Sequence, residues 1–183
     1  MRLPLLAAAA LAAVVVLPLP ALAESSLTAY EAARQALLAV WADLPLTTRN
    51  VTLTEGVATA YGNYTPRAGN SFAPGEPVHV YLEVLGYGWK DNGDGTVSQL
   101  LDADLTLLDA QGNTIGSKPG FLTSNVASRE KLLESFLTLD VTLSAFDPGA
   151  YTLHYVLHDR AGGKDATFDV PIVLAAGASS EAR

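Results

Sequence analysis

The chain has 183 residues, a formal net charge of −8 at pH 7 and no cysteine. So acidic a chain repels the phosphates of nucleic acids and of anionic membrane surfaces, and neither is expected as a partner. Without cysteine, the chain can form no disulfide and has no thiolate nucleophile.

The first segment, residues 1–23, has the three parts of a cleavable secretory signal peptide. Arg2 is a positive n-region, residues 3–19 form an apolar h-region, and Ala21-Leu22-Ala23 is a small-x-small cleavage site. Prolines end the apolar run, which is slightly shorter than the roughly 20 residues of a spanning helix, so a retained anchor is the weaker alternative. No cysteine follows that could be lipidated. We therefore expect a bacterial protein that is periplasmic or secreted and has no membrane span after cleavage.

A helix is predicted next, over residues 24–45. Thr28 and Glu31 have the spacing of a capping box, and Pro45 ends the helix. An apolar stripe follows the helical period: Tyr30, Ala33, Leu37, Val40 or Trp41, and Leu44. The amphipathic pattern predicts that the stripe packs on the following domain or closes one end of it, with a partner-binding helix as the alternative.

Residues 46–174 alternate between apolar and polar side chains, which is typical of strands with one apolar face. The clearest strands are at 78–84, 101–107, 137–143, 151–157 and 166–172. Short turns rich in glycine, proline, asparagine and aspartate separate most of them. The pattern predicts an all-β antiparallel sandwich, with a closed barrel as the alternative. The small polar residues 175–183 are expected to be a disordered tail.

Two stretches do not fit a simple meander of strands. Residues 60–77 form a long polar loop with aromatic side chains, and residues 116–130 form a second irregular link. A short helix is expected near residues 128–134. Long irregular loops in a compact domain are often functional.

Three motifs resemble bacterial exported immunoglobulin-like domains. The segment Phe72-Ala73-Pro74-Gly75-Glu76-Pro77-Val78-His79-Val80 resembles the entry to an early strand of those domains, and Phe146-Asp147-Pro148-Gly149-Ala150-Tyr151-Thr152-Leu153 resembles a late strand. His158-Asp159 followed by Gly162-Gly163-Lys164 resembles the hairpin after it. The resemblance covers about residues 50–174 and implies an immunoglobulin-like β-sandwich. Such domains mostly serve as adhesion, scaffold or accessory modules, and no catalytic residue is implied.

The polar residues do not assemble into a catalytic, metal or cofactor motif. His154 and His158 share one strand face but lie roughly 13 Å apart, too far to hold one ion. The segment 91–96 lacks the oxygen ligands of an EF-hand and is predicted to be a glycine-rich hairpin turn. Asp102 and Asp104 are expected to solvate the outer face of their strand. We therefore predict no catalytic residue, no metal and no cofactor.

Four aromatic residues are the candidate ligand-binding residues: Tyr61, Tyr64, Tyr87 and Trp89. Exposed aromatic rings offer rigid apolar area with a polar group, which suits recognition of sugars or proteins. The alternative interpretation is that they cover the open end of the sandwich.

The sequence thus predicts a non-enzymatic exported β-sandwich that binds another envelope or extracellular protein or belongs to an envelope assembly. A carbohydrate-binding module that uses the four aromatic residues on a glycan is the first alternative. A periplasmic chaperone is the second and would require an exposed sheet edge for strand addition. A hydrolase is the third and would require a cleft with convergent polar groups.

Overall fold

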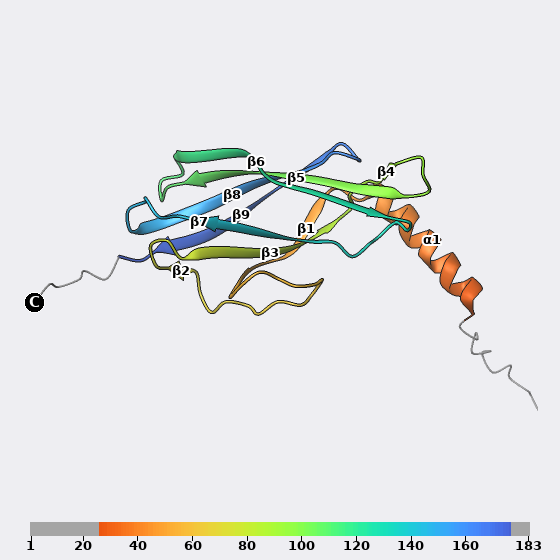
Figure 1. Ribbon diagram of the computed structural model, residues 1–183, viewed down its shortest axis with the longest axis horizontal. Coiled ribbons are helices and arrows are strands. Elements are labelled where there is room, and N and C mark those ends of the chain that lie inside the picture. Colours follow the sequence, from red (N-terminus) through yellow and green to blue (C-terminus); the bar gives the residue numbers. More distant parts are fainter. Residues whose placement is uncertain (1–25, 177–183) are drawn as a thin grey trace, which may run out of the picture.

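The computed structural model describes residues 26–176 as an all-β sandwich preceded by one helix (Figure 1). The predicted signal peptide and almost all of the predicted tail lie outside these residues. The elements are α1 (Leu27–Asp43), β1 (Thr47–Thr54), β2 (Ser71–Phe72), β3 (Pro77–Leu85), β4 (Lys90–Asp91), β5 (Val97–Leu108), β6 (Thr114–Ser128), β7 (Phe136–Thr142), β8 (Gly149–Asp159) and β9 (Lys164–Leu174). The predicted all-β sandwich with one preceding helix is confirmed.

Two separate sheets form the sandwich, so the alternative of a closed barrel is wrong. One sheet has three strands in the order β1-β3-β7. The other has six strands in the order β2-β9-β8-β5-β4, with β6 paired to β5 as well. The pairings are antiparallel except that of the two-residue β2, which runs parallel to β9.

The core lies between the inner faces of the two sheets, where alternate residues of each strand point inward. The fully buried side chains include Val78, Val80 and Leu82 of β3, Leu101 and Ala103 of β5, and Leu153, Tyr155 and Leu157 of β8. These are the apolar positions of the period-two pattern, because only one face of each strand can be removed from water in a two-layer fold.

The connection between β5 and β7 differs from the prediction. Instead of an irregular link, residues 114–128 form β6, the longest strand described, and no helix forms near residues 128–134. Lys118, Pro119 and Gly120 break the alternation, and the register with β5 shifts between Ala103 and Leu105 at this point. A β-bulge absorbs these residues, so a strand forms although its sequence lacks strict alternation.

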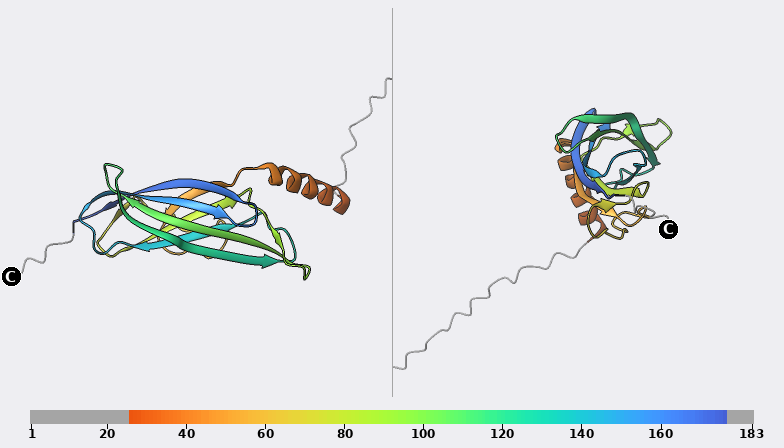
Figure 2. Two further views of the ribbon diagram at one scale, coloured as in Figure 1. Left: turned by 90° about the horizontal axis from the view of Figure 1, so that it is seen from above. Right: turned by 90° about the vertical axis from the view of Figure 1, so that its left-hand side faces the viewer.

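Helix α1 begins and packs differently from the prediction, although it ends before Pro45 as expected. Its N-cap is Ser26, whose side chain accepts a hydrogen bond from the backbone N–H of Ala29 at 3.1 Å, so the predicted capping box at Thr28 is not used. Figure 2 shows α1 continuing past the ends of the strands. Only Trp41 of the helix is buried. Of the predicted apolar stripe, Trp41 and Leu44 pack at the end of the sandwich, whereas Tyr30, Leu37 and Val40 stay exposed, so only the last turn of the stripe closes that end.

Helix α1 is not long and apolar enough to cross a membrane.

Candidate functional site

The exposed apolar side of α1 is the most unusual surface of the described chain. Twelve of its 17 residues are apolar, yet nearly all of the helix is exposed. The exposed fractions of its large apolar side chains are 76% for Leu27, 62% for Tyr30, 49% for Leu37 and 59% for Val40. Residues three and seven positions apart share one side of a helix, so these four form one surface, which we call the α1 face.

The C-terminal end of α1 is held firmly against the sandwich. Trp41 is 4% exposed, and its indole N–H donates a hydrogen bond to the backbone carbonyl of Tyr87 at 2.8 Å. Its ring meets that of Tyr87 edge to face at 5.2 Å and lies 5.9 Å from that of Trp89. The three rings close the end of the sandwich from which α1 projects.

Lys164 completes this attachment by capping the end of the helix. Its ammonium group donates to the backbone carbonyls of Ala42 at 3.2 Å, Leu44 at 2.6 Å and Gly86 at 2.8 Å. The last carbonyls of a helix have no partner within the helix, and a cation beside them also complements the helix dipole. We call Trp41, Tyr87, Trp89 and Lys164 the helix anchor.

A second contact holds the middle of α1. Arg34 forms an ion pair with Glu130 at 2.9 Å, in the loop between β6 and β7. Together with the helix anchor, this contact fixes the direction in which α1 projects. The α1 face is therefore presented by a held helix.

Two of the four predicted aromatic residues belong to the helix anchor. Tyr87 is 1% exposed, so the expectation that its ring is exposed is wrong, and its hydroxyl donates to the carbonyl of Leu132 at 2.7 Å. Burial raises the pKa of the Tyr87 phenol well above its ordinary value. Trp89 is partly buried, and the ammonium of Lys131 lies 5.4 Å from its ring centroid. These two residues cover the end of the sandwich, as the alternative interpretation expected.

The other two, Tyr61 and Tyr64, contact a different part of the sandwich and fasten the 55–70 loop to the outer face of β3. The Tyr64 ring stacks on that of Tyr81 at 4.2 Å. The Tyr61 hydroxyl donates to the carboxylate of Glu83 at 3.0 Å. The four aromatic residues therefore do not form one shared surface. The prediction that they bind a glycan remains untested.

Glu83 is a buried carboxylate on the outer face of β3. It is 4% exposed because the 55–70 loop covers it, and it accepts hydrogen bonds from Asn50 at 2.9 Å and from Arg49 at 2.7 Å. Burial alone would raise its pKa, but the hydrogen bonds from Asn50, Arg49 and Tyr61 outweigh burial and lower it. Each carboxylate oxygen has partners, so Glu83 holds the loop in place.

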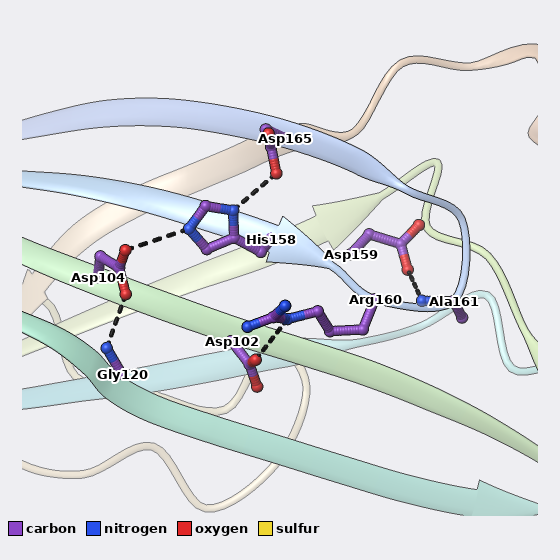
Figure 3. A network of polar contacts seen from close by, with 8 residues as sticks. All are labelled: Asp102, Asp104, Gly120, His158, Asp159, Arg160, Ala161 and Asp165. Carbon is purple, nitrogen blue, oxygen red and sulfur yellow. Dashed lines mark hydrogen bonds and ion pairs between the residues drawn. The ribbon is translucent and has the colours of Figure 1, made fainter.

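The outer face of the larger sheet carries a network of charged side chains (Figure 3). His158 contacts Asp165 at 2.7 Å through Nδ1 and Asp104 at 3.3 Å through Nε2. Arg160 donates to Asp102 at 2.7 Å. Asp104 also accepts from the backbone N–H of Gly120 at 2.7 Å, which ties the β6 bulge to β5.

The pKa shifts in this network follow from these contacts. The hydrogen bond from Gly120 and then that from His158 lower the pKa of Asp104. The hydrogen bond to Asp165 raises the pKa of His158 despite some burial. Each carboxylate of the network is paired with a basic side chain or a backbone N–H, and the network includes no hydroxyl or thiol nucleophile. Its role is therefore cross-strand ion pairing. Within residues 26–176, no group of three or more His, Cys, Asp or Glu side chains is placed to hold a metal ion.

No family model and no curated protein sequence matches the chain. Among solved structures, a family 123 glycoside hydrolase from Clostridium perfringens, studied for glycolipid glycan hydrolysis, is similar over 72% of this chain. The identity is 11% and the TM-score 0.39, and this chain spans 27% of that enzyme. At this TM-score the likeness supports no inference about function.

Proposed function

We propose that this protein is a non-enzymatic, exported binding module of bacteria that uses the α1 face to bind an apolar groove of another envelope or extracellular protein. The observation that carries the proposal is the exposure of Leu27, Tyr30, Leu37 and Val40 on a helix that is held at its C-terminal end. Export is supported by the signal-peptide pattern of residues 1–23.

The chemistry of the α1 face indicates the kind of partner. Its large side chains carry no charge, and helices with apolar side chains at such spacings bind by laying that side into a hydrophobic groove. A helix that is apolar on most of its surface is ordinarily buried, whereas α1 is covered only near Trp41. A groove lined by apolar side chains would remove this surface from water at roughly 25 cal/mol per Å².

Because the contacts at its C-terminal end and at Arg34 hold α1 in one direction, a binding role is favoured over that of a flexible linker. A flexible helix would lose orientational freedom when it binds, whereas the helix anchor has already fixed α1 in the free protein. The carbonyl contacts of Lys164 and the ion pair of Arg34 supply this order.

Site-specific photo-crosslinking in the envelope of the producing cell tests the proposal. A photoreactive residue at Val40 lies on the α1 face, and one at Gln35 lies on the opposite side of the same helix and is the matched control. We expect one protein to be crosslinked from Val40 and not from Gln35, and the product to disappear when Leu37 is also changed to Asp. Equal crosslinking from both positions, or none from Val40, would contradict the proposal.

A further inference from the structure

Strand β7 leaves one of its edges without a partner strand. It is the last strand of the three-stranded sheet and, within residues 26–176, pairs only with β3. The backbone N–H of Val84 donates to the carbonyl of Ser135 at 3.0 Å, so the backbone groups of Ser135 point toward β3. In an antiparallel pair, successive residues point their backbone N–H and C=O groups alternately toward and away from the partner strand. The backbone groups of Phe136, Thr138, Asp140 and Thr142 therefore point away from β3.

Two other long edges of the sandwich are protected against strand addition. The middle of β6 carries Lys118, Pro119 and the bulge at Gly120. The end of β1 is covered by the 65–67 segment, whose Arg67 donates to the carbonyl of Leu53 at 2.8 Å. Proline, lysine, bulges and covering loops are the usual protections of exposed edges. Strand β7 has no proline, lysine or bulge, and its one charged residue, Asp140, is paired with His79 of β3 at 2.6 Å.

A groove with a partly apolar lining lies beside the C-terminal part of the unpaired β7 edge, at residues 140–143, and its polar lining includes Ser117, Lys118, Asp140 and Thr142. It has a volume of about 330 Å³ and lies between β5 and β6 on one side and β7 with the residues after it on the other. Its apolar lining consists of Leu105, Leu107 and Phe121 from the larger sheet and Val141, Leu143 and Phe146 from the β7 side. Phe146 is 36% exposed, so apolar area remains in contact with water at this site.

We propose that the free edge of β7 accepts an extended segment of another protein, which pairs with the outward backbone groups and places alternate apolar side chains in the groove. Outward backbone groups that recur at every second residue match an extended chain, whose own groups have the same spacing. The adjoining groove gives such a strand a place for the side chains of one face.

The size of the groove and the charge of the chain favour a single segment over a second copy of this protein. Strands β6 and β7 bound the groove on opposite sides, so it has room for only a few side chains. Two copies, each with a formal charge of −8, would also repel each other. The site is separate from the α1 face, because the groove lies beside the C-terminal end of β7 and Arg34 contacts the loop before its N-terminal end.

Binding of a synthetic peptide to the purified protein tests this proposal. The probe alternates valine and threonine over the length of β7 and carries lysines at both ends for solubility. We expect it to slow hydrogen exchange of the Phe136, Thr138, Asp140 and Thr142 amides, as measured by NMR. Thr142→Pro removes one outward N–H and should weaken binding roughly five- to tenfold, whereas Thr142→Ala keeps that N–H and should bind like the unchanged protein.

A modified peptide tests the same backbone pairing without any substitution in the protein. Methylation of alternate backbone nitrogens on the pairing side removes the donors of the probe, and we expect this peptide not to protect the four amides. Equal binding of the methylated peptide would overturn the proposal, as would shifts confined to groove side chains without amide protection. Concentration-dependent protection in the absence of peptide would also overturn it by identifying a second copy as the occupant.

Discussion

Single glycines shape the segment that receives the end of α1. Gly86 has φ +76°, and a Cβ atom there would collide with the backbone carbonyl oxygen of Pro45, two residues after the end of α1. Gly93 has a similar φ of +78°, but a Cβ atom there would meet nothing within 4 Å. Comparing substitutions at Gly86 and Gly93 therefore separates the cost of backbone strain from the cost of a steric collision.

Gly86→Ala should destabilise the protein by about 3 kcal/mol, whereas Gly93→Ala should cost about 1 kcal/mol. Both variants strain the backbone, but only the first also displaces the segment beside Pro45. Urea unfolding followed by circular dichroism measures both changes. Equal losses of stability would show that the collision at Gly86 is relieved without cost.

Two buried tyrosines differ in whether the hydroxyl is satisfied. The Tyr155 hydroxyl finds no hydrogen-bond partner within the described part of the chain, whereas that of Tyr87 donates to the Leu132 carbonyl at 2.7 Å. Burial raises the pKa of the Tyr155 phenol far above its ordinary value. The energetic role of each hydroxyl follows from this difference.

Tyr155→Phe should leave the free energy of unfolding unchanged or raise it by up to about 1 kcal/mol, because the change removes an unpaired polar group from the core. Tyr87→Phe should lower it by about 1 kcal/mol, because it leaves the Leu132 carbonyl without its donor. Chemical unfolding of both variants under one condition gives the comparison. A clear loss of stability in Tyr155→Phe would indicate a hydrogen-bond partner for its hydroxyl, such as a buried water.

At the scale of elements, the His158 network joins β5, β8, β9 and the bulge of β6. The folded-state pKa of His158 is raised above its ordinary 6.5, chiefly by its hydrogen bond to Asp165. The charged groups that face this network are Asp102, Asp104, Asp165 and Arg160. A raised folded-state pKa means that the protonated imidazole stabilises the native state.

This stabilisation is complete below about pH 6.5 and is lost as the pH rises through the folded-state pKa. We expect the unchanged protein to lose more stability between pH 6 and pH 9 than His158→Gln, by no more than about 1 kcal/mol for so accessible a pair. Urea unfolding of both proteins at the two pH values measures the difference. An identical pH dependence would show that His158 contributes nothing to pH-dependent stability.

The sequence predicted most strands because their alternation reports burial directly. The strands β3, β5, β7, β8 and β9 coincide with the strictly alternating segments. Strand β6 was missed because a bulge interrupts its alternation of apolar and polar residues. The local sequence does not show that β5 pairs with β6 on both sides of the bulge.

The candidate site was harder to predict because it depends on contacts between distant residues. The contact of Lys164 with Leu44 joins residues at opposite ends of the described chain. The helical period identified an apolar stripe on α1 but could not show whether the sandwich covers it. Likewise, Tyr87 was predicted among the exposed aromatic residues, whereas Trp41 of the distant helix packs on that ring and helps to bury it.

At the scale of the whole molecule, the sandwich serves as a base from which α1 projects. The order of α1 depends on the helix anchor, because most of the stability of helices in proteins comes from tertiary packing and α1 packs mainly through Trp41. Lys164→Met keeps the length of the side chain but removes three hydrogen bonds to backbone carbonyls.

Lys164→Met should therefore accelerate amide hydrogen exchange throughout α1 by at least about tenfold and leave exchange in β5 and β8 nearly unchanged. Arg160→Met removes a charge from the same β8–β9 hairpin, where the side chain of Arg160 donates to Asp102 at 2.7 Å, and it is the matched control. Hydrogen exchange followed by mass spectrometry resolves the helix from the strands. Unchanged exchange in α1 would mean that the contacts of Trp41 and Arg34 hold the helix without Lys164.

The most direct test of the α1 face is the affinity of the purified protein for the partner crosslinked from Val40. Leu37→Asp places a charge within the α1 face, and Gln35→Asp places the same charge on the opposite side of the helix. We expect Leu37→Asp to weaken binding at least about tenfold while Gln35→Asp stays within about twofold of the unchanged protein. Equal affinities for the two variants, with α1 intact in both, would contradict the assignment of α1 as the binding element.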